Sequence, residues 1–128
     1  MRGALVQANY GGALVMDGLP VGRLLGTYYL SDHLAQQADA DGSVVVVLAT
    51  DAPLSDRNLQ RLARRAMGGI ARTGAAFSDG SGDYAIAFAT HPGTIRTPEM
   101  RAGEARLADW PNDRISPLFA AAIEATEE

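Results

Sequence analysis

Six consecutive apolar residues, Val44 to Ala49, place the strongest constraint on how this chain folds. Four of them are valines, whose β-branched side chains favour a strand. An unbroken apolar run of this kind predicts a strand that is buried on both faces. Ser43 stands at the first position of the strand, directly after Gly42. Taken alone, a Gly-Ser pair before a strand predicts only a turn.

A helix is predicted directly after this strand, because apolar side chains recur at helical spacing from Leu59 to Ile70. Ser55 is the expected N-cap, and Asp56 places a negative charge where the helix dipole favours it. Gly74 is expected to end the helix. The arginines of this helix lie mainly off the apolar stripe, so we interpret them as a solvated face rather than an anion site.

Two further strands are predicted, over residues 4–8 and 84–90. A second short apolar run at 13–16 follows a glycine-containing turn, so the first strand is expected to form a hairpin with it. Residues 91–114 hold several prolines and no sustained period, which predicts a loop that Trp110 pins to the body.

A C-terminal helix is predicted from Ser116-Pro117, with Ser116 as N-cap and Pro117 at the first helical position. Its last residues, 124–128, include three glutamates and no glycine or basic residue. Negative charge is unfavourable at this end of the helix dipole. We therefore expect the chain to be a fragment that stops inside a helix.

Composition predicts an ordinary globular domain with a mildly acidic surface. The chain has 128 residues, a hydrophobic content of 47% and a formal net charge of −4. It lacks the basic excess that a nucleic-acid partner requires, and its absence of cysteine excludes disulfides. No apolar run approaches the roughly 20 residues that span a bilayer, and no signal-peptide pattern opens the chain. No membrane association and a cytoplasmic location are therefore expected.

The simple catalytic constellations are not found in the sequence. A Ser-His-Asp triad needs a histidine, but His33 and His91 stand in no recognisable signature. No paired spacing of metal ligands occurs, so no metal is expected. The loop Gly80-Ser81-Gly82 precedes a strand rather than a helix, which argues against a phosphate loop.

A serine that is activated by its own new N-terminus is the remaining option. If the bond between Gly42 and Ser43 breaks, Ser43 gains an α-amino group with a pKa of about 8, suited to a general base. The same hydroxyl would make the cut by attacking the carbonyl of Gly42, giving an ester that water hydrolyses. Glycine leaves this carbonyl open to attack. The polar run from Gln36 to Asp41 is expected to let the new end move away.

Several long motifs in order then resemble the L-aminopeptidase/D-esterase family, which includes the β-peptidyl aminopeptidases. The motifs are VQANYG at 6–11, DGLPVG at 17–22, GSVVVVLATDAPL at 42–54, RLARRA at 61–66, ARTG at 71–74, GSGD at 80–83, ISPLF at 115–119 and EATEE at 124–128. The resemblance runs nearly end to end. It covers only the C-terminal portion of the longer family chain, whose N-terminal part supplies half the fold and an active-site tyrosine.

The resemblance implies an α/β (α+β) fold that is part of a four-layer αββα sandwich similar to N-terminal-nucleophile hydrolases. It implies a single domain over 1–128, divided by self-cleavage into the end of an α-subunit-like segment, 1–42, and a β-subunit-like segment, 43–128. The missing N-terminal half and other copies of the chain, in a homo-oligomer, are the expected partners.

The resemblance also implies the roles of individual residues. Ser43 is the implied nucleophile, assisted by Ser81 and Asp83, and Asn9 supplies an oxyanion contact. Read without the resemblance, Ser81 and Asn9 are turn residues, and Asp83 accepts backbone hydrogen bonds at a strand entry. No cofactor is expected.

The implied activity is that of a serine aminopeptidase, a hydrolase that releases N-terminal amino acids from short peptides, amides or esters. The alternative is an inactive truncated fragment or an assembly module that keeps the motif but does not cleave. An acetyltransferase of the ornithine-biosynthesis type shares the self-cleaving logic. That family uses threonine as nucleophile, so Ser43 argues against it.

Overall fold

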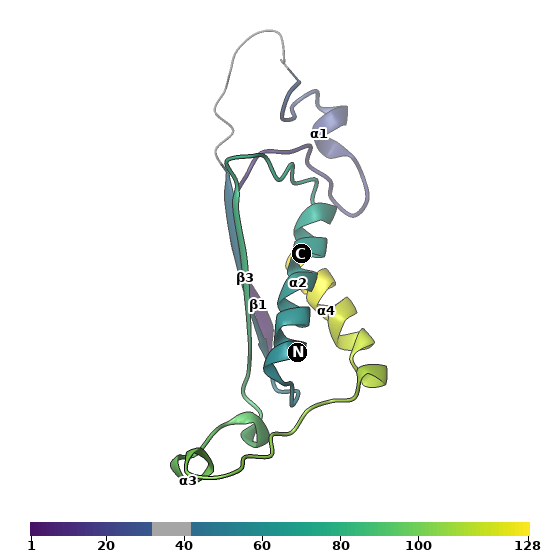
Figure 1. Cartoon of the computed structure of the whole chain (residues 1–128). Coiled ribbons are helices and arrows are strands. Elements are labelled where there is room, and N and C mark those ends of the chain that lie inside the picture. Colours follow the sequence, from purple (N-terminus) through teal and green to yellow (C-terminus); the bar gives the residue numbers. More distant parts are fainter. Residues whose placement is uncertain (32–41) are drawn as a thin grey trace.

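A three-stranded sheet and two long helices form the body of the protein (Figure 1). The computed structural model describes residues 1–31 and 42–128. Strand β1 (Gly3–Asn9) pairs antiparallel with β2 (Ser43–Thr50), which pairs parallel with β3 (Gly82–Ala89). Helices α2 (Asp56–Arg72) and α4 (Ser116–Glu127) lie side by side on one face of the sheet.

Short helical turns lie toward the two ends of this body (Figure 1). They are α1 (Val21–Leu24), the 3-10 turns η1 (Pro92–Thr94) and η2 (Asn112–Arg114), and α3 (Pro98–Arg101). The expected order of the three strands and two main helices is confirmed. The flexible run that was expected from Gln36 to Asp41 lies outside the described residues.

Strand β2 is the middle strand, but the expectation that both its faces are buried is wrong. Val44, Val46 and Leu48 face the helices and are at most 1% exposed. Val45, on the opposite face, is 38% exposed. The reason is that alternate side chains of a strand point to opposite faces, and the described helices cover only one of them.

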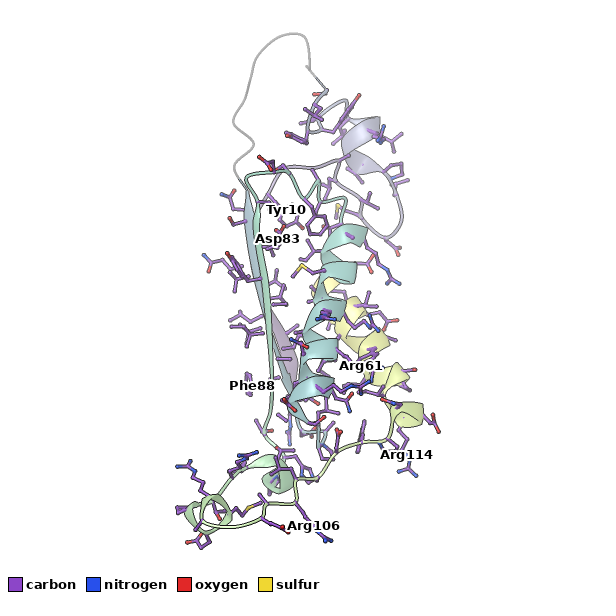
Figure 2. All side chains as sticks on the ribbon, viewed as in Figure 1. Tyr10, Arg61, Asp83, Phe88, Arg106 and Arg114 are labelled. Carbon is purple, nitrogen blue, oxygen red and sulfur yellow. The ribbon has the colours of Figure 1, made fainter. Side chains whose placement is uncertain are left out.

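The uncovered face of the sheet is strongly apolar. It presents an exposed row of large side chains from all three strands, namely Leu5, Val45, Tyr84, Ile86 and Phe88. Figure 2 shows Phe88 on this side, pointing away from the helices. We call these five residues the bare face. A contiguous apolar patch of this kind marks an interaction surface on a folded protein.

The predicted hairpin between residues 4–8 and 13–16 is wrong. Strand β1 pairs instead with β2, from Gly3 opposite Ala49 to Asn9 opposite Ser43. Residues 13–15 bond to the end of α2, where the N–H of Ala13 donates to the carbonyl of Gly74 at 3.0 Å. Seven residues of β1 pair with β2, which satisfies more main-chain groups than pairing with the four-residue run could.

Helix α2 begins and ends as predicted. The Ser55 hydroxyl accepts from the N–H of Asn58 at 3.4 Å. Gly74 has a φ of +90°, a conformation that glycine adopts without strain, and it follows the C-cap Thr73. The buried stripe of the helix includes Leu62, Ala66 and Ile70, and it packs on the sheet.

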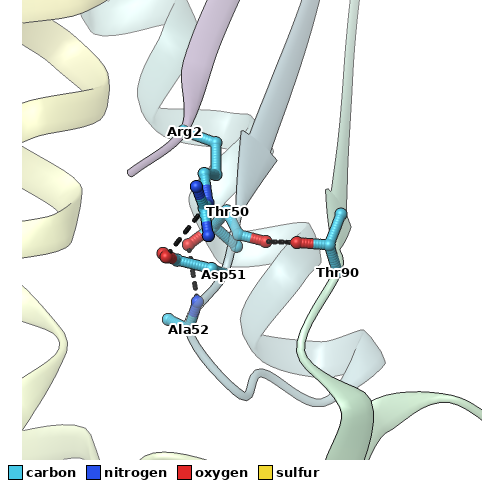
Figure 3. Close-up of polar contacts among 5 residues, drawn as sticks. All are labelled: Arg2, Thr50, Asp51, Ala52 and Thr90. Carbon is cyan, nitrogen blue, oxygen red and sulfur yellow. Dashed lines mark hydrogen bonds and ion pairs between the residues drawn. The ribbon is translucent and has the colours of Figure 1, made fainter.

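Thr50 is the last residue of β2, at the other end of the strand from Ser43, and it is fully buried (Figure 3). Its hydroxyl accepts from the N–H of Ala52 at 3.1 Å, and its carbonyl accepts from the hydroxyl of Thr90 at 3.3 Å. The exposed ion pair between Arg2 and Asp51, at 3.1 Å, lies beside this turn. These contacts end the strand where the sequence predicts it.

The C-terminal segments differ in detail from the sequence expectation. Ser116 is the first residue of α4 rather than its N-cap, and Ile115 takes the cap position without a side-chain bond. Ile115 is buried in the core, which fixes the helix start one residue earlier than its capping chemistry suggests. Trp110 pins the loop as predicted, because its side chain packs against the core and its main-chain N–H donates to the carbonyl of Pro53 at 2.9 Å.

The two main helices pack closely at Gly69. A Cβ atom there would lie 2.5 Å from the carbonyl oxygen of Ile123, and at neighbouring Gly68 it would meet nothing nearer than 3.5 Å. Gly69→Ala is therefore expected to reduce the free energy of unfolding by about 1–3 kcal/mol through overpacking. Gly68→Ala is expected to raise it by up to about 1 kcal/mol through helix propensity. Urea unfolding of the two variants would test this, and equal effects would contradict the packing.

Asp109 joins the loop to the start of α2. Its carboxylate accepts from the N–H of Ser55 at 2.8 Å and from the side-chain amide of Asn58 at 2.9 Å. Asp109 is exposed, and the loss of some surrounding water in the fold raises its pKa, but the hydrogen bonds from Asn58 and Ser55 outweigh this effect and leave the pKa lowered.

A lowered pKa in the folded state means that Asp109 stabilises the fold above the unfolded pKa of about 3.9, and that this contribution is lost as the pH falls through the folded value. Asp109→Asn is expected to unfold more easily at neutral pH, with a difference from the parent that shrinks in acid. Urea midpoints from pH 7 down to pH 3 measure this. Asp113→Asn, an exposed site in η2, is the control for the change of charge.

Candidate active site

The three strand ends that meet at Ser43 form the candidate site. Ser43 is the first residue of β2, with Asn9 opposite on β1 and Gly82 opposite on β3. Paired residues share a face, so Ser43 and Asn9 lie on the side of the bare face, and both are exposed. The structure therefore brings the predicted nucleophile beside the predicted oxyanion contact.

Gly42 precedes the strand and is buried against β1. A Cβ atom at this position would lie 2.7 Å from the Cα of Tyr10 and 3.0 Å from the carbonyl oxygen of Asn9. Both neighbours are main-chain atoms of an anchored segment, so they would yield only at a cost. Packing alone therefore requires glycine before Ser43.

Tyr10 anchors the segment that carries Asn9 (Figure 2). Its hydroxyl lies 2.6 Å from the hydroxyl of Thr73. The Thr73 hydroxyl donates its single proton to the carbonyl of Ile70 at 2.7 Å, so Tyr10 must be the donor to Thr73. The end of α2 thus holds the chain next to Gly42 in place.

Ser81 and Asp83 form a second pair. The Ser81 hydroxyl donates to the carboxylate of Asp83 at 2.7 Å, and both residues are half-buried. Asp83 pairs with Val44, whose side chain faces the helices, so Asp83 lies on the face of the sheet opposite Ser43. Figure 2 shows Asp83 on this side, near Tyr10. Among residues 1–31 and 42–128, no hydrogen bond joins this pair to Ser43.

The main-chain N–H of Gly82 is the contact of Ser43 that sequence reasoning missed. It donates to the Ser43 hydroxyl oxygen at 3.4 Å and to the carbonyl oxygen of Gly42 at 3.3 Å. The sequence signal was the glycine in GSGD at 80–83, which we interpreted only as part of a loop. Tyr10, in VQANYG at 6–11, was likewise visible but had no assigned role.

Histidine and metal chemistry have no support in the described part of the chain. His91 follows β3 at the end of the sheet opposite Ser43, where its ring nitrogen accepts from the N–H of Gly93 at 3.0 Å. His33 lies outside the described residues. Within 1–31 and 42–128 no cluster of three or more His, Asp or Glu residues could hold a metal ion, and no helix is long and apolar enough to cross a membrane.

Comparison with solved structures first defines the class of fold. The chain superposes with a TM-score of 0.74 and 35% identity on the L-aminopeptidase D-Ala-esterase/amidase of Ochrobactrum anthropi, described as a prototype of the serine aminopeptidases and a new variant of the Ntn hydrolase fold. A Pyrococcus horikoshii protein matches with a TM-score of 0.76 and 39% identity. Each match covers 97% of this chain and 32% of the solved chain.

Sequence comparison then gives the family. The model of peptidase family S58 matches residues 1–128, and the chain belongs to this family. It is 39% identical over 137 aligned residues to the β-peptidyl aminopeptidase BapA of Sphingosinicella microcystinivorans, covering 98% of this chain. The chain spans about a third of the length of that relative, 34%. The family that the sequence motifs indicate is therefore confirmed.

Proposed function

We propose that this chain is the nucleophile-bearing portion of a self-processing serine aminopeptidase, which cuts its own Gly42–Ser43 bond and then uses Ser43 against substrate. The substrates are N-terminal residues of short peptides, amides or esters. Membership of family S58 supports the class. The names of the two relatives, a β-peptidyl aminopeptidase and an L-aminopeptidase D-Ala-esterase/amidase, support these kinds of bond.

The placement of Ser43 carries the proposal. A serine hydroxyl stands at the start of the central strand, directly after a glycine that close packing against Tyr10 makes necessary. Without a histidine near it among the described residues, Ser43 needs another base. A free α-amino group on the same residue supplies one, since its pKa of about 8 lies close to neutral.

Asn9, Ser81 and Asp83 are proposed to assist Ser43. The side-chain amide of Asn9 has donors to offer a developing oxyanion, and its strand position lies opposite Ser43. Asp83 lies on the neighbouring strand β3, on the face of the sheet opposite the Ser43 hydroxyl, and Ser81, which directly precedes β3, donates to it. Once the bond to Gly42 is cut, the new amino group can take the hydroxyl proton of Ser43, and the carboxylate of Asp83 attracts the positive charge that then forms.

The bare face supports a wider assembly. The five bare-face residues, Leu5, Val45, Tyr84, Ile86 and Phe88, belong to the same side of the sheet as Ser43. We propose that the part of the family length that this chain lacks packs a second sheet there, completing a four-layer αββα sandwich. The assembled enzyme is proposed to be a homo-oligomer in the cytoplasm.

A second candidate function, an inactive fragment or assembly module, is favoured by the same bare face. A chain that leaves this much apolar surface uncovered is expected to bind a partner through that surface. Such a module would keep the Gly42–Ser43 bond intact at all times.

Intact-mass measurement separates the two candidates. The chain is purified alone and also joined to the part of the BapA relative that it lacks, and each sample is assayed on an amino-acid amide. Two products that meet between Gly42 and Ser43, together with amide hydrolysis, are the expected result for the joined protein. A single uncut species in both samples, 13.4 kDa for the chain alone, would reject the proposed enzyme and favour the module.

A further inference from the structure

The main-chain N–H of Gly82 contacts both groups that would react in self-cleavage, the carbonyl of Gly42 and the hydroxyl of Ser43. It lies 3.3 Å from the carbonyl oxygen of Gly42 and 3.4 Å from the hydroxyl oxygen of Ser43. We propose that this N–H is the oxyanion donor for self-cleavage, stabilising the negative charge that develops on the Gly42 oxygen. This inference rests on the proposed function, because it concerns the same bond.

The atoms of the step balance within the chain. The Ser43 oxygen forms a bond to the carbonyl carbon of Gly42, and the π electron pair moves onto the carbonyl oxygen. Collapse of this intermediate breaks the bond to the Ser43 nitrogen, which receives the proton that the hydroxyl gave up. The product is an ester of Gly42 on Ser43, and one water molecule then hydrolyses it to a carboxylate and the free hydroxyl.

The Gly82 donor serves this step because its bond becomes stronger as the reaction proceeds. In the folded chain the N–H is shared between two neutral oxygens, and both distances are long for a hydrogen bond. When full negative charge forms on the Gly42 oxygen, the bond becomes charge-assisted and shortens. An interaction that is stronger in the transition state than in the ground state lowers the barrier.

The donor is also held rigidly in position. The parallel pairing of β2 with β3 continues without a break from Ser43 opposite Gly82 to Thr50 opposite Ala89. At the far end the N–H of Thr90 donates to the carbonyl of Thr50 at 2.8 Å. A donor fixed in advance needs no reorganisation when the charge forms. Gly82 therefore approaches Ser43 from β3, while Asn9 lies beside it on β1.

The pairing of β2 with β3 offers a matched control. The N–H of Gly82 donates to the carbonyl of Gly42, just before β2, and the N–H of Thr90 donates to the carbonyl of Thr50, the last residue of β2. Replacing the amide by an ester removes one N–H and no side chain, and it is made with glycolic acid at Gly82 or with the hydroxy acid analogue at Thr90. Both esters are introduced into whichever protein self-cleaves without them, the chain alone or the chain joined to the part of the BapA relative that it lacks. The measured quantity is the rate at which the Gly42–Ser43 bond is lost, from intact mass.

The ester at Gly82 is expected to slow self-cleavage by about 100-fold or more, as the loss of one oxyanion donor does elsewhere. The ester at Thr90 is expected to change the rate less than about threefold, with a similar thermal midpoint. Equal rates in the two esters would overturn the role of Gly82 and leave the proposed function standing. An unmodified parent that never cleaves would overturn both.

A second measurement does not depend on how the esters fold. In Ser43→Ala, where the bond stays intact, NMR follows the exchange of the Gly82 N–H with deuterium and reports whether this N–H is hydrogen-bonded. Exchange slower than that of an exposed amide without a partner is expected. Unprotected exchange in a folded chain would contradict the inference.

Discussion

Ser43→Ala is expected to leave the Gly42–Ser43 bond uncut and to lower amide hydrolysis by at least about a thousandfold, as the loss of a nucleophile does in serine hydrolases. The reason is that the hydroxyl is proposed both to make the cut and to attack the substrate. Ser43 is exposed at the start of β2, so removing one oxygen atom costs the fold little. Intact mass and an amide-hydrolysis assay measure the two effects separately.

Ser43→Thr is the informative companion, because it keeps the hydroxyl and adds a methyl group on the exposed side. We expect slower but detectable processing from it. Ser31→Ala, at an exposed turn residue whose N–H donates to the carbonyl of Tyr28, serves as the control and should behave as the parent. Cleavage at the same bond in Ser43→Ala would mean that another group is the nucleophile.

Gly42→Ala is expected to slow self-cleavage by more than tenfold, although alanine is small and leaves the scissile bond chemically similar. The new Cβ would lie 2.7 Å from the Cα of Tyr10, a distance that Cβ atoms do not tolerate. Tyr10 is held by its hydrogen bond to Thr73, so Gly42 must move instead. Its carbonyl then leaves the position in which Gly82 and Ser43 meet it, and a shift of about 1 Å is enough to cost 100-fold.

Gly3→Ala is the control for this prediction, because a Cβ atom there would meet nothing within 4 Å. Processing is followed by intact mass, and folding by circular dichroism at rising temperature. Tyr10→Phe would relax the anchor without adding an atom, so combining it with Gly42→Ala should restore part of the rate. Rapid cleavage of Gly42→Ala in a well-folded chain would show that the close packing of Gly42 has no role in the reaction.

The elements that the sequence predicts best are those whose signals are local. Strand β2 and helix α2, with its cap at Ser55 and its end at Gly74, follow from apolar period and terminal residues over short stretches. The partner of β1 does not, because strand pairing between residues far apart in the chain leaves no mark in either strand alone. The bare face does not follow from local signals either, because a valine run has the same composition whether one face of the strand is covered or both.

The candidate site likewise has one part that the sequence predicts and another that depends on the register of the strands. The family motifs indicate Ser43, Asn9, Ser81 and Asp83 as residue types in order. Their sides of the sheet depend on register: Ser43 pairs with Gly82, so Asp83, one residue further on, faces the helices. The contact from Gly82 comes from its main-chain N–H rather than from a side chain, so the sequence motif does not reveal its role.

Because the proposed cut falls between β1 and β2, it would leave these two strands on different polypeptides. Their antiparallel register extends from Gly3 opposite Ala49 to Asn9 opposite Ser43, and helix α4 also contacts β1. The two pieces would therefore remain associated through this strand pairing after the covalent bond is cut. Size-exclusion chromatography should report one particle where denaturing electrophoresis resolves two bands.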